Sequence, residues 1–150
     1  MSLRSEMMLD AKLIMRDGLL RINPFASIDD RGYVDTWQAN LLPELDPILI
    51  EPDFRSGKGS ELDRKFCAAH SSAALVANVF GPFRDGATSL LIPGIGKTYL
   101  ERFERTFPTG VIGRTPPHLD ASGRGPLGVV AIESKCLEYF TNKVAEFAPA

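Results

Sequence analysis

The chain has 150 residues, of which 44% are hydrophobic and 24% are charged, and its formal net charge is −2. This length suits one domain with a hydrophobic core, and the composition excludes disordered, collagen-like and coiled-coil proteins. The slightly acidic balance excludes a nucleic-acid binder of the kind that overall basic charge reveals, so any contact with DNA must be local. No apolar run approaches the ~20 residues of a membrane span, and the N-terminus lacks the pattern of a secretion signal, so we expect a cytoplasmic protein.

The N-terminal part of the chain predicts a helix followed by an irregular cover. Residues Ser5 to Asp17 place apolar side chains near one side of a helix, which Gly18 could end. From Asn23 to Gly59, prolines and turn-forming sequences such as DDRG and RSGKG indicate turns and short segments. We therefore expect residues 1–59 to cover a core formed by residues 60–150, within one compact domain.

The helical pattern is strongest between Ser60 and Phe80. Ser60 can cap this segment, Asp63 occupies the reciprocal position of a capping box, and Gly81 with Pro82 can end the helix. Cys67 and Cys136 lie far apart in apolar segments, so reduced, buried thiols are expected. The apolar side chains that recur at helical spacing, and that we expect to pack against a sheet, are Leu62, Phe66, Ala69, Ala73, Val76 and Phe80.

Three strand-like segments follow this helix, covering residues 99–107, 117–122 and 129–136. TSLLIP predicts a short strand or a helix lead-in, GRGPLG a hairpin connection, and LEYFTNKVAEF a last helix. PGIGKT resembles a phosphate-binding loop but has Leu91 where that motif needs glycine, so a turn before a strand accounts for it better. The expected fold is α/β, with a central mixed β-sheet flanked by helices.

The segment HLDASGRGPLGVVAIESKC places charged residues where two paired strands end. Strand alternation puts Glu133 and Lys135 on one face, and the hairpin brings Asp120 next to them. Two close carboxylates stay ionised only if a cation lies between them, and oxygen ligands suit Mg²⁺ or Mn²⁺. Asp120 and Glu133 therefore predict a metal site, with the main-chain carbonyl of Ser134 as a third ligand. The alternative is an exposed ion pair of Glu133 and Lys135, worth at most ~1 kcal/mol.

Asp120, followed after about a dozen residues by Glu133-Ser134-Lys135, resembles the pattern of the PD-(D/E)XK nuclease superfamily. The sequences ELDRKFCAAHSSAALVANVFGPF, FERTFPTG, TPPHLD and VVAIESKCLEYF together resemble a bacterial family of restriction-endonuclease-like proteins, over residues 56–148. The chain departs from the pattern in two places. Leu119 separates Asp120 from the prolines before it, and the chain ends before the further helix and strand of the superfamily core. We therefore expect a core truncated at its C-terminus or completed by a partner.

The resemblance implies a Mg²⁺- or Mn²⁺-dependent endonuclease that hydrolyses DNA phosphodiester bonds. It implies that Asp120 and Glu133 bind the metal and that Lys135 is the catalytic lysine. Members often add a glutamate from the first core helix, for which Glu61 is the nearest candidate, ahead of Glu104 and Glu138.

Local positive charge supplies candidates for DNA contact, although a solvated face is the commoner role of scattered charges. The alternative function is a catalytically inactive nuclease-like domain that acts as a binding or assembly module. We also expect the chain to form a homodimer or to expose an apolar sheet edge. The candidate DNA-binding residues are Arg64, Lys65, His70, Arg114, His118 and Arg124.

Overall fold

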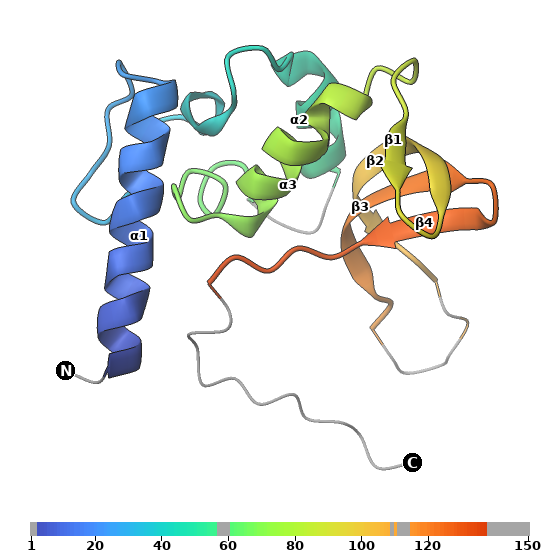
Figure 1. The fold of residues 1–150 in the computed structure, drawn as a ribbon. Coiled ribbons are helices and arrows are strands. Elements are labelled where there is room, and N and C mark those ends of the chain that lie inside the picture. The colour runs from blue at the N-terminus through green and yellow to red at the C-terminus, as the bar shows by residue number, and fades with distance from the viewer. Residues whose placement is uncertain (1–2, 57–60, 109, 111–114, 138–150) are drawn as a thin grey trace.

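The computed structural model describes residues 3–56, 61–108, 110 and 115–137, which form three α-helices and a four-stranded sheet (Figure 1). The helices lie to one side of the sheet, with α2 and α3 nearest to it. The helices are α1 (Leu3–Ile22), α2 (Pro47–Arg55) and α3 (Ser72–Phe80), with short 3-10 turns at Trp37–Asn40 and Gly81–Phe83. The strands are β1 (Leu90–Ile92), β2 (Gly96–Thr106), β3 (His118–Gly125) and β4 (Gly128–Ile132).

The sheet has the order β1-β2-β3-β4, and every described pair of neighbours is antiparallel. The α/β class is confirmed, but the mixed sheet is wrong for the described residues. Residues 93–95 join β1 to β2 and residues 126–127 join β3 to β4, and such short connections produce antiparallel hairpins. The register aligns Phe103, Ala121 and Ile132 across three neighbouring strands, with Phe103 and Ala121 fully buried.

The three predicted strands are confirmed, with changed ends. TSLLIP contributes β1, and PGIGKT forms the turn between β1 and β2, as its glycines indicate. The last strand stops at Ile132, four residues earlier than predicted, so the segment from Glu133 to Cys136 lies beyond the sheet. Of the predicted C-terminal helix, all residues after Leu137 lie outside the described residues.

The long helix predicted over residues 60–80 is wrong in its first half. Residues 61–71 form turns, and α3 begins at Ser72, with the hydroxyl of Ser71 accepting a hydrogen bond from the amide of Ala74 (3.2 Å). The reason is a distant partner: Nδ2 of Asn40 donates to the carbonyls of Phe66 (2.6 Å) and Ala68 (2.8 Å). These carbonyls are thus satisfied outside a helix. Ser60, the predicted cap, lies outside the described residues.

The N-terminal helix is confirmed but does not end at Gly18, because α1 continues to Ile22. The irregular cover also contains a helix, α2, whose first turn is capped by Asp46 through the amide of Ile48 (2.9 Å). No described helix is long and apolar enough to cross a membrane. Cys67 is buried and Cys136 is partly buried, and both are free thiols.

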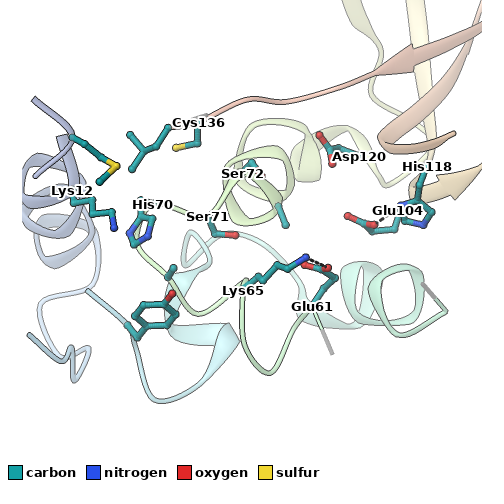
Figure 2. Close-up of a pocket in the computed structure, with 15 residues that line it drawn as sticks. Lys12, Glu61, Lys65, His70, Ser71, Ser72, Glu104, His118, Asp120 and Cys136 are labelled. Carbon is teal, nitrogen blue, oxygen red and sulfur yellow. Dashed lines mark hydrogen bonds and ion pairs between the residues drawn. The ribbon is translucent and has the colours of Figure 1, made fainter. Parts of the chain in front are cut away.

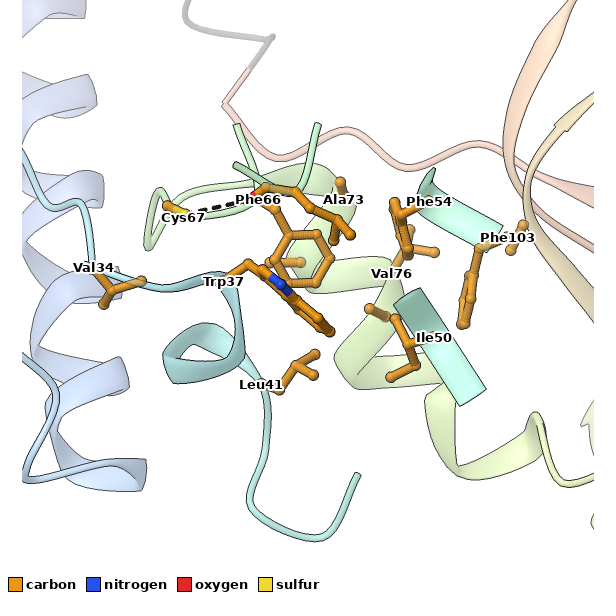
Figure 3. Packing of buried hydrophobic residues seen from close by; sticks show 14 of the residues in the cluster. Val34, Trp37, Leu41, Ile50, Phe54, Phe66, Cys67, Ala73, Val76 and Phe103 are labelled. Carbon is orange, nitrogen blue, oxygen red and sulfur yellow. Dashed lines mark hydrogen bonds between the residues drawn. The ribbon is translucent and has the colours of Figure 1, made fainter. Parts of the chain in front are cut away.

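The core joins the helices to the sheet through aromatic side chains (Figure 3). The ring of Phe54 lies 5.2 Å from that of Phe66 and 5.5 Å from that of Phe103, which it stacks upon. Phe66, Ala73 and Val76 are buried, as the helical spacing predicted, even though Phe66 does not lie on a helix. Helical spacing therefore identified core residues correctly where it misjudged the backbone.

Candidate active site

A pocket of about 460 Å³ lies between α1, residues 61–73 and the β2–β3 hairpin (Figure 2). Its two ends differ in chemistry. Near the sheet it is lined by the carboxylates of Glu61, Glu104 and Asp120, whereas Lys12 and His70 line the end formed with α1.

The carboxylate end is built by strand register. Phe103 pairs with Ala121 and Arg105 with Leu119, so Glu104 and Asp120, which lie between these pairs, are neighbours on adjacent strands. Glu61 enters from the turns before α3, where Lys65 lies 2.7 Å from its Oε1 atom. Three acidic side chains from three separate segments therefore share one wall.

Glu104 is the most unusual residue of this end. It is only 9% exposed, and its φ of 50° lies in the left-handed region that residues other than glycine rarely adopt. Burial, followed by the charges of Asp120 and Glu61, raises the pKa of Glu104 to about 7, while Lys65 acts in the opposite direction. Nδ1 of His118 lies 3.0 Å from Oε2 of Glu104. Glu104 therefore exchanges its proton near neutral pH.

The predicted Glu-Ser-Lys segment lies against Asp120. The amide of Ser134 donates a hydrogen bond to Oδ2 of Asp120 (2.5 Å), and metal binding by its carbonyl stays a prediction. Lys135 forms an ion pair with Glu133, and their side chains are 44% and 43% exposed. Neither Glu133 nor Lys135 lines the pocket, but the charge of Glu133 is one of the causes that raise the pKa of Glu104.

The candidate DNA-binding residues are divided by the structure. Lys65, His70 and His118 line the pocket, whereas Arg64 does not. Arg124 lies near the far end of β3, where Nε contacts Oε1 of Glu101 at 2.9 Å. Arg114 and the lower-ranked metal candidate Glu138 lie outside the described residues.

Two residues of the pocket were underestimated or missed by sequence reasoning. The resemblance ranks Glu104 below Glu61 as a metal ligand. Aligning residues 99–107 with residues 117–122 as paired strands could have placed Glu104 opposite Asp120. Lys12 was not considered, because only the tertiary contact between α1 and residues 61–73 brings it to the pocket. No local pattern around Lys12 signals that contact.

The residues at the carboxylate end fit a hard divalent cation in chemistry. Their oxygen atoms are the ligands that Mg²⁺ and Mn²⁺ prefer. The pKa of Glu104 is raised first by burial and then by neighbouring negative charge, and a cation would neutralise that charge. In the described part of the chain, no three His, Cys, Asp or Glu side chains are placed so that they could hold one ion as they stand. Binding of one ion by these side chains would therefore require them to rotate, because Glu61 and Glu104 contact Lys65 and His118.

The pocket is the feature from which a function can be inferred. It combines acidic groups near the sheet with an ammonium group and an imidazole near α1. Such a division suits a ligand that carries negative charge and also contacts a bound cation. Comparisons with protein families, curated proteins and solved structures found no match to this chain.

Proposed function

We propose that the chain is a metal-dependent nuclease that hydrolyses DNA phosphodiester bonds, as its resemblance to restriction-endonuclease-like proteins implies. One observation carries the proposal: the carboxylates of Glu61, Glu104 and Asp120 share a pocket beside the Glu133–Lys135 segment. The β2–β3–β4 meander and the apolar helix α3 beside it are compatible with the core of such a nuclease.

The metal ligands in this proposal are Asp120, Glu104 and Glu61, with Glu133 adjoining them. A bound Mg²⁺ or Mn²⁺ would polarise a phosphate oxygen and lower the pKa of a water molecule. The amide of Ser134 donates a hydrogen bond to the Asp120 carboxylate, which holds it in place. Burial, more than any other cause, raises the pKa of Glu104 to about 7, close to neutral pH. The chain thus supplies negative charge that is fixed in position at Asp120 and adjustable at Glu104.

Lys135 is the proposed catalytic lysine. Its ammonium group forms an ion pair with Glu133. In the sequence, Lys135 directly follows Ser134, whose amide donates to Asp120. Lys135 does not line the pocket, so its ammonium group would turn from Glu133 to donate a hydrogen bond to the phosphate oxygen on which charge develops. Lys65 and His118, at the same end of the pocket, supply donors for neighbouring phosphate oxygens.

The proposal is tested by titrating Mn²⁺ calorimetrically and by measuring plasmid nicking. Asp120→Asn and Glu104→Gln should lose both Mn²⁺ binding and cleavage, because each removes a ligand. Lys135→Ala should keep Mn²⁺ binding while cleavage falls by roughly 10²-fold, as for loss of one transition-state donor.

The matched control is Glu101→Gln, which changes a carboxylate on the same strand that contacts Arg105 and Arg124 instead of lining the pocket. It should behave like the wild type in both assays. If the wild type binds no Mn²⁺ at millimolar concentration, the nuclease proposal is overturned.

A second candidate function is an inactive nuclease-like domain that acts as a binding or assembly module. It is favoured by the absence, among the described residues, of three side chains already placed to hold one ion. Leu127 (85% exposed) and Val129 (52% exposed) add apolar surface at the β4 edge, which suits a homodimer. This candidate predicts no Mn²⁺ binding in the titration above and a dimer mass by light scattering.

A further inference from the structure

The end of the pocket formed with α1 contains polar groups that the proposed chemistry does not use. Lys12 projects from α1, and His70 lies beside it in the turn that precedes α3 (Figure 2). Among the described residues, no hydrogen bond or ion pair involves Lys12, and Nδ1 of His70 is fully buried without a hydrogen-bond partner. Buried polar atoms are normally satisfied, so the unsatisfied Nδ1 is unusual. The other ring nitrogen, Nε2, is not covered in this way and is the atom of His70 that can meet a group in the pocket.

The environment of His70 indicates the charge of that group. Burial, and after it the positive charge of Lys12, lowers the pKa of His70, so its ring is neutral at neutral pH and keeps one N–H donor. The edge of the ring meets Tyr33, at 6.0 Å between centroids and 88° between planes, which fixes its orientation. An ammonium group and a fixed imidazole donor on one wall complement an anion with several oxygen atoms.

We propose that Lys12 and His70 form a phosphate-binding subsite, which receives a phosphate group of the substrate other than the one that reacts. The carboxylates lie at the opposite end of the same pocket, so one nucleotide unit would span from the reacting phosphate to this subsite. The pocket volume of about 460 Å³ suits one such unit. The identification of this phosphate as part of a nucleic acid rests on the proposed function.

The subsite can be tested without metal and without cleavage. The chain has only two histidines, His70 and His118, so their ring signals in a ¹⁵N–¹H NMR spectrum can be assigned with a His118→Asn variant. Inorganic phosphate, titrated into the metal-free protein, should shift the His70 signals saturably. Lys12→Ala should weaken this binding about tenfold or more, since a charge-assisted hydrogen bond contributes roughly 1.5–3 kcal/mol.

Lys97→Ala is the matched control, because Lys97 is exposed on β2 and lies outside the pocket. This variant should bind phosphate as the wild type does. If the His70 signals show no saturable shift, a water molecule accounts for the polar groups at this end of the pocket and the subsite is overturned. If the two lysine variants weaken phosphate binding equally, general surface charge accounts for the binding and the subsite is likewise overturned.

A second arm separates a nucleic-acid phosphate from free phosphate. A short single-stranded DNA should compete with inorganic phosphate for His70, and Lys12→Ala should lower the salt dependence of DNA binding by about 0.7 in logarithmic slope. DNA binding that is unchanged in Lys12→Ala and does not displace phosphate would overturn the assignment to a nucleic acid. Since no metal is present, failure here is distinct from failure of Mn²⁺ binding, which bears on the nuclease proposal alone.

Discussion

Glu104 combines three features that are each costly for a folded protein. Its side chain is buried, its backbone adopts a left-handed conformation, and it lies beside two other carboxylates. Backbone strain of this kind costs about 1–3 kcal/mol and is concentrated at functional sites. The surrounding strands hold Glu104 in place, because the residues on either side of it, Phe103 and Arg105, keep their pairing with β3.

The pH dependence of stability should reveal the buried carboxylate. The pKa of Glu104 is raised from 4.5 to about 7, so within this range the folded chain keeps a proton that the unfolded chain releases. Stability therefore falls as the pH rises through this range. In metal-free buffer, Glu104→Gln should remove roughly 1–3 kcal/mol of that fall, measured by urea unfolding at several pH values.

The control for this measurement is Glu101→Gln, whose effect should have the opposite sign. The contacts of Arg124, and then those of Arg105, hold the pKa of Glu101 below its ordinary value, so its contribution is present at neutral pH and is lost on acidification. A wild-type protein and a Glu104→Gln variant with the same pH profile would contradict the assignment of Glu104.

At the scale of elements, the strands could be predicted and the long helix could not. Alternation and turn residues are local, and they located β2, β3 and the GRGPLG hairpin. The turns at residues 61–71 depend on Asn40, which lies more than twenty residues earlier and occupies the carbonyls of Phe66 and Ala68. Sequence periodicity contains no information about such a partner, so the segment looked helical.

The same distinction applies to the candidate site. Asp120 and Ser134 could be brought together from the sequence, because a hairpin sets their register. The pairing of Glu104 with that strand also follows a register, although a bulge between Leu100 and Arg102 shifts it. Lys12 and His70 meet only through tertiary packing, so the sequence could not place them together.

Two glycines should respond in opposite ways to alanine. A Cβ atom at Gly123 would lie 2.5 Å from the carbonyl oxygen of Tyr99 on β2, and backbone cannot move aside without disturbing the sheet. Gly123→Ala should therefore lower the free energy of unfolding by roughly 1–3 kcal/mol. Gly18→Ala, in open space within α1, should stabilise that helix by up to about 1 kcal/mol. Urea unfolding followed by circular dichroism measures both, and a neutral Gly123→Ala would contradict the described β2–β3 packing.

At the scale of the whole molecule, α2 is fixed to the sheet by a buried polar link as well as by the aromatic core. Oδ2 of Asp53 accepts hydrogen bonds from Arg84 (2.7 Å and 3.0 Å) and from the amide of Phe103 (3.0 Å). The carboxylate thereby connects a helix, the segment after α3 and the centre of β2. Within the described residues, no equivalent link joins α1 to the sheet, and Leu19 is the only described side chain of α1 that is buried.

The shallow attachment of α1 makes its local opening a reporter of what occupies the pocket. Regions with few buried side chains open at low free energy, and their amide hydrogens exchange with solvent through that opening. An anion held between Lys12 and His70 must leave when α1 opens, so its binding free energy is added to the cost of opening. At a phosphate concentration ten times the dissociation constant, the amides of α1 should exchange roughly tenfold more slowly, and Lys12→Ala should abolish this protection. Exchange that phosphate leaves unchanged would show that α1 and the pocket behave as independent parts of the protein.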